Sequence, residues 1–478
     1  MKISRRNALI GGAGIIGAPV VIGGGQHVAW SGRNFTKDSF DYPEFEAGPG
    51  QTVWKNWAAN QGAVLSAIKS LQSEEELASI VANAQGGIRP LGSGHSWSGV
   101  VPTDGTDGTL IDLGRFVGVY DVDLPARTAV VGAGTRIGQA ARLLAEQGLA
   151  FPNLPDINQQ TLAGAFATAT HGTGQELPAM HDSVIGFRMV TANGEILDVT
   201  AETNADLFEA GKVSLGALGI ITQYTLKLKP RFLLHRRVWL EDIYQLLDRA
   251  PEMLEMHPFF EFFYLHNVGK ALVIVHNYYD GDPSDVRETP DDDDLLEQLK
   301  HLRNELGWWP WMRRRMFNSA FPSDVEIENV KEESWKLLST PRPTKIFETE
   351  YHIPVESGIA AYKEMLKFLD NRKSFYFPSE FRYIGPDNAW LSPFNDGVRN
   401  SISFHTPANE DYSLHAEVIE PMMLRHGGRP HWGKVHSLKY EQLKDMYPKF
   451  NSFRELRREL DPEGKFLNQH LKSLFGES

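Results

Sequence analysis

Two histidines in glycine-rich loops are the residues of this chain whose surroundings most clearly predict chemistry. His95 lies in residues 88–99, which read I-R-P-L-G-S-G-H-S-W-S-G, and His171 lies in residues 161–174, which read T-L-A-G-A-F-A-T-A-T-H-G-T-G. Glycine permits positive backbone torsion angles and leaves N–H groups free to converge on an anion, so the first loop predicts a pyrophosphate cradle. The small side chains of the second loop let its backbone approach a large flat ligand. No G-x-G-x-x-G opens an amphipathic helix here, so the first loop does not match the Rossmann fingerprint.

A candidate acid–base pair lies in the C-terminal half. Glu380 and Arg382 stand two apart in E-F-R, within the alternating residues 374–384, so their side chains should share one face of a strand. For an arbitrary pair of this kind, a surface salt bridge is the commoner outcome. Here the flanking residues predict an aromatic enclosure, and they are Phe375, Tyr376, Phe377 and Tyr383.

Two further motifs follow the pair. S-F-H-T contains His405 and Thr406, and R-P-H-W-G-K, at residues 429–434, ends in Lys434. With the two glycine-rich loops, the order E-x-R, F-H-T, H-W-G-K resembles the vanillyl-alcohol-oxidase type of FAD protein. Within that type it resembles the sugar-1,4-lactone and alditol oxidases, of the D-arabinono-1,4-lactone oxidase kind. The resemblance runs from about residue 54 to residue 475 and includes D-P-E-G-K-F-L-N at residues 461–468.

The resemblance implies an α+β, two-domain, PCMH-type FAD-binding fold with an antiparallel-sheet cap domain. It implies FAD bonded covalently through one histidine, His95; the chain has no cysteine, so the additional cysteine link of some relatives is excluded. His171 is expected to fix its loop or contact the flavin. The residues implied at the cofactor are Leu91, Gly92, Ser93, Gly94, His95, Ser96, Trp97, Ala165, Thr168, Thr170, His171, Gly172, Thr173, Gly174, Ile220 and Ile221.

The side chains of the C-terminal motifs suit alcohol oxidation, in which a hydride leaves carbon while a proton leaves the hydroxyl group. Arg382 is permanently charged and suits the negative charge of a reduced flavin ring. Glu380 is expected to bind substrate hydroxyls and hold Arg382 in place. Lys434 can accept a proton if burial lowers its pKa. The choice of base among Lys434, Glu380 and His405 is open at this point.

The substrate predicted from these groups is a polyol or aldonolactone, because several polar partners in one pocket match several hydroxyl groups. His405 and Thr406 are expected to bind substrate oxygens, and the resemblance adds Thr161. The leading interpretation is oxidation of a CH–OH group of a sugar 1,4-lactone, with electrons passed to dioxygen. An alditol oxidase is the alternative, as is a lactone dehydrogenase with another acceptor, since Ala169 puts a methyl group near the flavin where many relatives have glycine.

Composition excludes other classes of function. The chain has 478 residues and a formal net charge of -13, which argues against a nucleic-acid partner. Without cysteine it has no disulfide, thiolate metal site or thiol nucleophile. A flavin carrier without turnover is an alternative that the combination of Glu380, Arg382 and Lys434 disfavours. A metal hydrolase using His431 and His436 is a poorer one, because a lysine competes at such a site.

The elements expected to position these residues divide the chain into an FAD-binding domain at 45–230, a cap domain at 231–436 and a C-terminal segment at 437–478 that returns to the first domain. A capping box at Ser73 and Glu76 predicts a helix before the first loop. Asn193-Gly194 predicts a hairpin. Further strands are predicted at 109–113, 128–131, 220–229, 259–266, 271–279, 345–353, 374–384 and 401–405, and helices at 137–147 and 355–369.

Two other segments carry predictions of their own. Residues 1–30 have a basic start, a twin arginine at Arg5-Arg6 and a glycine-diluted apolar run, and they predict a signal for the twin-arginine export machinery. The protein is then periplasmic or extracellular, or anchored if the signal stays uncleaved. Arg313, Arg314 and Arg315, beside Trp308, Trp309 and Trp311, predict either an exposed helix or a patch for a membrane surface or partner.

Overall fold

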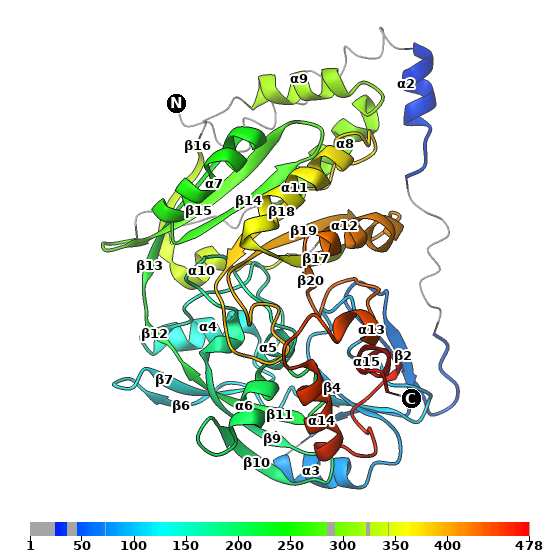
Figure 1. Cartoon of the computed structure of the whole chain (residues 1–478), viewed down its shortest axis with the longest axis vertical. Helices are drawn as coiled ribbons and strands as arrows, with labels where there is room; N and C mark the ends of the chain where they lie inside the picture. The colour runs from blue at the N-terminus through cyan, green and yellow to red at the C-terminus, as the bar shows by residue number, and fades with distance from the viewer. Residues whose placement is uncertain are drawn as a thin grey trace.

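The computed structural model describes residues 24–35, 45–71, 73–283, 292–321, 326–342 and 344–477. Two regions lie one above the other, with the eight-stranded sheet in the upper half and smaller sheets in the lower half (Figure 1). Of the predicted signal, residues 1–23 lie outside the described residues, and Gly24–Ser31 forms helix α2. Within the described part of the chain, no helix has the length and apolar character needed to cross a membrane.

A three-stranded parallel sheet, in the order β3-β5-β4, delivers the chain into the first glycine loop. The strands are β3 (Ala67–Ser70), β5 (Thr109–Asp112) and β4 (Ile88–Leu91). The predicted helix before β4 is confirmed as α3 (Glu74–Ala82), since the Glu76 amide donates to the Ser73 hydroxyl at 3.3 Å. The strands β1 (Thr52–Lys55) and β2 (Gly62–Leu65) form a separate pair.

An antiparallel sheet in the order β10-β9-β11-β7-β6 completes the N-terminal half. Its strands β9 and β10 pair across the predicted Asn193-Gly194 turn, where Gly194 has a φ of +84°. The bounds are β6 (Val119–Asp123), β7 (Thr128–Gly132), β9 (Val184–Val190), β10 (Ile196–Thr200) and β11 (Ile220–Lys227). The connecting elements are α4 (Ile137–Glu146), β8 (Leu149–Ala150), α5 (Leu162–Ala167), the 3-10 helix Met180–Ser183, α6 (Ala205–Lys212) and β12 (Lys229–Pro230).

The upper half is built on an antiparallel sheet of eight strands, in the order β16-β13-β15-β14-β18-β19-β17-β20. The strands are β13 (Leu233–Asp242), β14 (Phe259–Leu265), β15 (Lys270–Tyr279), β16 (Glu326–Glu333), β17 (Ile346–Pro354), β18 (Ser379–Ile384), β19 (Arg399–Pro407) and β20 (Arg429–Pro430). The predicted strand at 374–384 therefore begins late, at Ser379, and the one at 401–405 is longer than predicted.

Helices cover one face of this sheet and leave the other for the site. They are α7 (Ile243–Met256), α11 (Val355–Leu369), which has its predicted bounds, and α12 (Glu420–Arg425), which follows the short π-helix His415–Ile419. In Figure 1, α7 and α11 lie in front of the sheet. Phe262, Phe381 and Phe404 point toward these helices into one buried cluster. Because side chains alternate along a strand, residues 261, 380, 382 and 405 face the opposite way.

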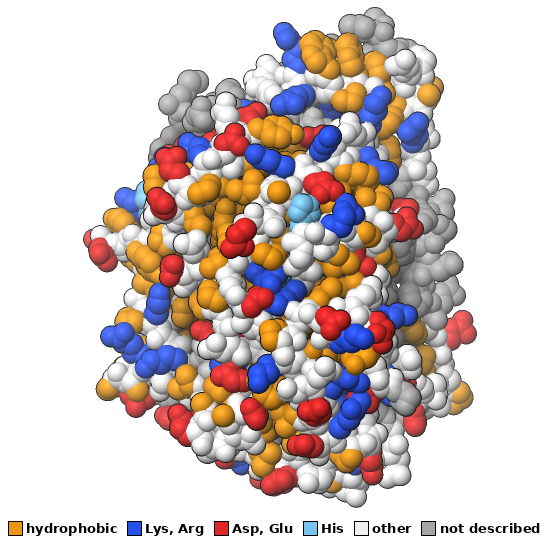
Figure 2. Space-filling model, viewed as in Figure 1, with side chains coloured by type: hydrophobic (Ala, Val, Ile, Leu, Met, Phe, Trp, Pro, Cys, Tyr) orange, Lys and Arg blue, Asp and Glu red, His pale blue; other side chains and the backbone are white. Residues whose placement is uncertain are grey.

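The Trp–Arg segment is part of a helical layer at the far end of the sheet. Trp311 and the three arginines lie in α9 (Pro310–Ala320), and Trp308 and Trp309 come directly before it. Helix α9 packs on α8 (Asp292–Leu306), and the short helix α10 (Ser334–Leu338) follows β16. Arg313 is buried and donates to the carbonyls of His266 and Phe375, each at 2.9 Å, so this arginine is structural. Trp311 is 60% exposed. Basic and hydrophobic side chains lie side by side over α9 at the top of the view (Figure 2).

The C-terminal segment packs on the N-terminal half. Its helices are α13 (Tyr440–Leu443), α14 (Phe450–Leu460) and α15 (Gln469–Phe475), and they share a buried cluster with α4 and α5. Arg89, in the middle of β4, ties the two together. Its buried guanidinium donates to the carbonyls of Val100, Gly216 and Phe466 at 2.5–2.9 Å.

Candidate active site

The first glycine loop forms the wall of a cavity of about 930 Å³ in the N-terminal half. Gly94 takes a φ of +68°, and its carbonyl accepts a hydrogen bond from the Trp57 amide at 2.8 Å. A Cβ on Gly92 would lie 2.3 Å from the Thr161 hydroxyl oxygen, so only glycine fits where the two predicted loops meet. The predicted cofactor residues that line the cavity are Gly92, Ser93, Gly94, His95, Ser96, Trp97, Thr168, Thr170 and Ile221.

His95 lines this cavity and is a neutral imidazole there. Its ring stacks on Trp57 with centroids 5.1 Å apart, and its Nδ1 is buried with no hydrogen-bond partner among the described residues. Burial lowers the pKa of His95 to about 4, with smaller contributions from Arg136 and Lys434. An unpartnered buried nitrogen at the wall of a cavity is a sign of a missing ligand.

The other predicted cofactor residues lie elsewhere. Ala165 and Ile220 point into the hydrophobic core, and Leu91 lies in the strand before the loop. Residues 172–174 bind the cap sheet, since the Thr173 hydroxyl donates to the Phe260 carbonyl at 2.6 Å and the Gly174 amide donates to the Tyr383 carbonyl at 2.6 Å. A Cβ on Gly172 would lie 2.3 Å from Asn153 Oδ1, which explains the glycine by packing alone.

The H-W-G-K loop of the cap is hydrogen-bonded to the glycine loop. The Trp97 amide donates to the Gly433 carbonyl at 2.8 Å, and the Ser98 hydroxyl donates to the Trp432 carbonyl at 2.6 Å. These bonds place the Lys434 ammonium 4.5 Å from the ring centroid of Trp97. Lys434 is thereby held against the wall of the cofactor cavity.

A second cavity, of about 1500 Å³, lies between the N-terminal half and the open face of the large sheet. The two cavities share four lining residues: Gln160, Thr170, His431 and Lys434. Of the residues predicted to act on substrate, Glu380, Arg382, His405 and Lys434 line the second cavity. The predicted catalytic trio is therefore brought together beside the cofactor cavity, with Lys434 at the junction.

Arg382 is surrounded by three carboxylates. It forms ion pairs with Asp156 and Glu261 at 2.7 Å and a closer one with Glu380. Carboxylates therefore surround Arg382 in place of the aromatic side chains that the sequence predicted. Phe377 lines the cavity, but Phe375 packs on Phe404 and Tyr383 faces the opposite side of the sheet, because Tyr383 has the parity of Phe381.

The three carboxylates around Arg382 differ in the direction of their pKa shifts. Burial raises the pKa of Glu380 well above its ordinary value; Arg382 opposes this, and Asp156 and Glu261 add to the rise. Burial also raises the pKa of Glu261. For Asp156, burial is outweighed by Arg382 and then Arg342, and its pKa is lowered. Two guanidinium groups, of Arg382 and Arg342, face three buried carboxylates, and this excess of negative charge contributes to the raised pKa values of Glu380 and Glu261.

Lys434 is paired with a carboxylate that the sequence motifs do not mark. Its ammonium forms a close ion pair with Glu348 and lies 3.7 Å from Glu350. Burial would raise the pKa of Glu348, but Lys434 and then His405 lower it to about 2. His405 Nδ1 donates to the Pro378 carbonyl at 2.8 Å, and its Nε2 lies 3.4 Å from Glu348.

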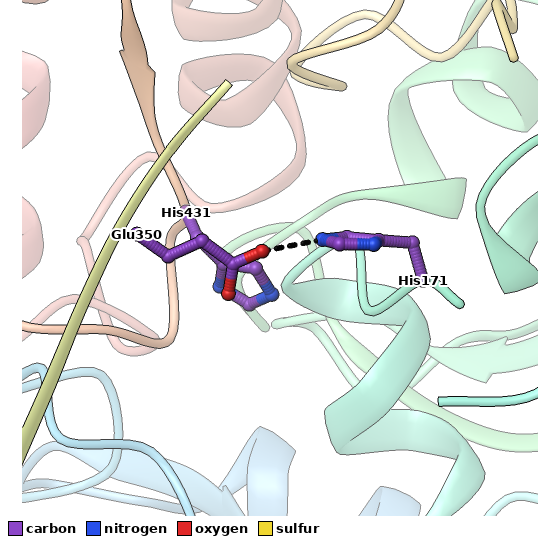
Figure 3. A group of neighbouring side chains, drawn as sticks. All are labelled: His171, Glu350 and His431. Atoms are coloured by element: carbon purple, nitrogen blue, oxygen red, sulfur yellow. Dashed lines mark hydrogen bonds and ion pairs between the residues drawn. The ribbon is translucent and has the colours of Figure 1, made fainter. Parts of the chain in front are cut away.

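His171 lines the second cavity and pairs with Glu350 (Figure 3). Its Nε2 lies 2.7 Å from Glu350 Oε1, and its Nδ1 lies 2.9 Å from the Gly172 carbonyl oxygen. A carbonyl oxygen and a carboxylate oxygen are both acceptors, so each ring nitrogen of His171 faces a hydrogen-bond acceptor. The contact with Gly172 agrees with the predicted role of His171 in fixing its loop, and the contact with Glu350 adds a partner from the cap sheet. His171 lies next to Thr170, which lines both cavities.

The hydrogen bonds of the histidines do not favour the metal interpretation. His171, Glu350 and His431 bring possible ligand atoms within 4.8 Å of one another. However, both nitrogens of His171 face hydrogen-bond acceptors, and His431 Nδ1 accepts from the Gly433 amide at 3.0 Å. Three of the four ring nitrogens therefore already have hydrogen-bond partners among the described residues. His436 packs against Trp432 and is outside this group.

Three predicted positions differ in the structure. Thr406 faces the core, with its hydroxyl 3.1 Å from His415 Nε2, because neighbouring residues of a strand point to opposite faces. Thr161 lines the cofactor cavity rather than the substrate side, since its hydroxyl caps α5 by accepting from the Gly164 amide at 3.3 Å. Ala169 has a φ of +59°, and its methyl group packs in the core without lining either cavity.

Several residues of the site carry little or no sequence signal. Glu348 and Glu350 stand two apart in F-E-T-E-Y, so both carboxylates face the same side of a predicted buried strand. That pattern was the only sequence signal that could have marked them as site residues. Gly216 and Gly219, before β11, also line the cofactor cavity. Asp156 and Gln160 lie in an irregular segment, where no periodicity marks them.

The residues present fit an FAD molecule. A large cavity lined by glycine and other small residues can accept a flat ring and a diphosphate, and Nδ1 of His95 lacks a partner among the described residues beside it. The second cavity shares Lys434 and three other lining residues with the first, so a substrate bound there would lie beside the cofactor.

Comparison with known proteins agrees with this geometry. Residues 66–200 match the FAD binding domain family, and residues 224–474 match the D-arabinono-1,4-lactone oxidase family. The chain is 32% identical over 435 residues to L-gulono-1,4-lactone dehydrogenase of Mycobacterium tuberculosis, covering 89% of this chain and 99% of the relative. It is 28% identical over 438 residues to alditol oxidase of a Streptomyces species, covering 88% and 99%.

Solved structures support the fold. Cholesterol oxidase from B. sterolicum superimposes with a TM-score of 0.72 at 14% identity, over 89% of this chain and 97% of the other. The PCMH-type two-domain α+β fold and the FAD cofactor expected from the sequence are therefore confirmed. The chain belongs to the D-arabinono-1,4-lactone oxidase family of FAD-dependent oxidoreductases.

Proposed function

We propose that this protein oxidises a CH–OH group of a sugar 1,4-lactone, as an enzyme of the D-arabinono-1,4-lactone oxidase kind. The observation that carries the proposal is the junction of the two cavities at Lys434, with Glu380, Arg382 and His405 on the substrate side. Charged and hydrogen-bonding groups on several strands match a substrate with several hydroxyl groups. FAD, when bound, accepts the hydride from the substrate carbon.

Glu380 is the proton acceptor in this proposal. The substrate C–H bond breaks with its electron pair, the O–H bond breaks as its proton passes to the Glu380 carboxylate, and a C=O bond forms. Its raised pKa makes Glu380 a better acceptor than Glu348, whose pKa is about 2. Lys434 is engaged with Glu348 and supplies positive charge at the junction, a role that the sequence predicted for Arg382. Arg382 positions Glu380.

His95 forms the covalent link to the cofactor in this proposal. A bond between a ring nitrogen of His95 and a methyl carbon of the benzenoid ring would replace one N–H and one C–H bond, and dioxygen would take up the two electrons and two protons released. The lowered pKa supports this role, because a neutral imidazole keeps a lone pair. The link would keep the cofactor bound outside the cytoplasm.

The electron acceptor is dioxygen in the leading proposal. The Streptomyces relative is an oxidase and the mycobacterial relative is a dehydrogenase, so both outcomes occur among similar chains. Ala169 does not support a dehydrogenase, since its methyl group lines neither cavity.

Anaerobic bleaching of the flavin tests this function. The oxidised protein is mixed with aldono-1,4-lactones, alditols and aldoses, and flavin absorbance is followed before and after air is admitted. Bleaching by a lactone and recovery in air support a lactone oxidase, and slow recovery supports a dehydrogenase. Bleaching by alditols alone supports the alditol alternative. A flavin that no member of the panel bleaches would contradict the proposal and revive the flavin-carrier alternative.

We also propose export by the twin-arginine route, on the sequence of residues 1–30 alone. Replacing Arg5 and Arg6 by lysine should retain the protein in the cytoplasm with its flavin bound. Unchanged export of that variant would contradict the proposal.

A further inference from the structure

The open face of the large sheet changes character from one side to the other. Glu350, Ser403, Glu380, Phe263 and Leu272 lie side by side across β17, β19, β18, β14 and β15. The first three are polar and the last two are apolar. With neighbouring strands about 4.8 Å apart, this row spans about 19 Å, longer than a monosaccharide lactone.

The parallel row has the same gradient. Ser401, Arg382, Glu261 and Ile274 lie across β19, β18, β14 and β15. Leu272 and Ile274 both line the second cavity, whereas Ala271, Val273 and Val275 of the same strand face the helices. Leu272 also packs against a separate buried cluster that contains Leu265 and Phe377, so the apolar wall is the side of that cluster that faces the cavity.

Other elements extend this apolar wall. Leu265, Leu296 of α8 and Phe377 line the same cavity. The two arginines beside the wall are already compensated: Arg236 lies 3.2 Å from Glu328, and Arg342 lies 3.1 Å from Asp156. Among the described residues, this end of the cavity thus offers apolar contact without an uncompensated cation for an acidic substituent.

We infer that the substrate is amphiphilic, with a polyhydroxylated end at Lys434 and Glu380 and an apolar substituent lying along Phe263, Leu272 and Ile274. This inference rests on the proposed function and adds the chemical class of the substituent. A free sugar lactone fills only the polar end and gains nothing from the apolar wall, whereas an alkyl or acyl group there is removed from water.

The polar end sets the orientation of such a molecule. Lys434 and His431 lie at the junction with the cofactor cavity, and the apolar wall lies on strands further along the sheet. The carbinol carbon must therefore belong to the hydroxylated end. The apolar substituent sits at the opposite end of the molecule and does not take part in the chemistry.

The experiment uses pairs of ligands that differ only in chain length, with the full-length holoenzyme. The first measurement is calorimetric binding of octyl β-glucoside and methyl β-glucoside below the micelle concentration. The second is anaerobic flavin reduction by an aldonolactone and by its acetyl and octanoyl esters at the terminal hydroxyl. Each buried methylene should tighten binding about fourfold. We expect octyl glucoside to bind at least about tenfold more tightly than methyl glucoside, and the half-saturating ester concentration to fall accordingly at an unchanged limiting rate.

Two substitutions of Leu272 test the apolar wall, and one of Leu124 is the control. Leu272→Asp should abolish the preference for the longer chain and leave the parent lactone unchanged, and Leu272→Ala should weaken that preference in case the aspartate variant does not fold. Leu124→Asp, at a residue 53% exposed and outside the cavity, should keep it. Equal binding of the two glucosides, or a preference that survives in Leu272→Asp, would overturn the inference. Octyl glucoside binding without flavin bleaching by any ligand would instead refute the proposed function and leave the apolar subsite standing.

Discussion

The ammonium of Lys434 lies 4.5 Å from the centre of the Trp97 ring, and the Trp97 amide donates to the Gly433 carbonyl at 2.8 Å. One contact joins the side chains of the two loops and the other joins their backbones. Together they fix a cation of the cap against the wall of the cofactor cavity. The catalytic proposal depends on this connection, because it determines where positive charge meets the flavin.

Replacing Lys434 by methionine should lower the two-electron midpoint potential of the flavin by about 30 mV, equivalent to about 1.4 kcal/mol, because the reduced ring loses a nearby positive charge. Flavin reduction should slow about a hundredfold. Potentiometric titration and stopped-flow absorbance measure the two effects. Lys449→Met, outside both cavities, is the control. An unchanged potential would place Lys434 away from the ring.

Replacing His95 by alanine should give folded protein whose flavin is released by acid precipitation. The yellow colour should pass to the supernatant, whereas the wild-type precipitate keeps it. His235→Ala is a suitable control, since His235 lies on β13 and lines neither cavity. Retention of the colour in the His95→Ala precipitate would show that another residue carries the bond.

Replacing Glu380 by glutamine should reduce the rate of flavin reduction about 10²–10⁴-fold and remove its rise with pH. The wild-type rate should rise as pH passes upward through the raised pKa of Glu380, because only the carboxylate accepts a proton. Glu261→Gln changes the same ion-pair group without lining the cavity, so its effect should be much smaller. A pH profile that is preserved in Glu380→Gln would assign the base elsewhere.

The neighbours His405 and Thr406 should respond differently to substitution. His405→Gln should raise KM about tenfold through loss of a substrate hydrogen bond. Thr406→Val should leave KM unchanged and lower the free energy of unfolding by about 1 kcal/mol, since only the contact with His415 is lost. Steady-state kinetics and denaturant unfolding separate the two cases. A raised KM in Thr406→Val would mean that its side chain reaches the substrate.

His436 should make the fold sensitive to acid. Burial lowers its pKa from 6.5 to about 4, and neither ring nitrogen has a hydrogen-bond partner in the part of the chain that the structure describes. Below pH 6.5, His436 takes up a proton in the unfolded chain but stays neutral in the folded chain. Its contribution to the free energy of unfolding is therefore present in full above pH 6.5 and is lost as the pH falls toward 4. The loss between about pH 7 and 4.5 is about 2 kcal/mol. His436→Phe should reduce the acid loss by that amount in denaturant titrations, and an unchanged pH dependence would contradict it.

The sequence by itself determined the local features. Side-chain caps, turn residues and alternation act within a few residues, so α3, the hairpin at Asn193-Gly194 and the shared face of Glu380 and Arg382 were all predicted. Glycine at 92 and 94 marked the cofactor loop for the same reason. The same alternation rule excludes Thr406 from the cavity once His405 is placed there.

Tertiary structure decided which charged side chains, far apart in the sequence, form ion pairs. Asp156, Glu261 and Glu380 come from three separate segments and meet at Arg382, and Glu348 meets Lys434 only because β17 lies beside β20. The pairing of strands far apart in sequence also built the polar-to-apolar gradient of the sheet. Ionisation in a buried site depends on the distances among all its charges, and no local pattern in the chain encodes those distances.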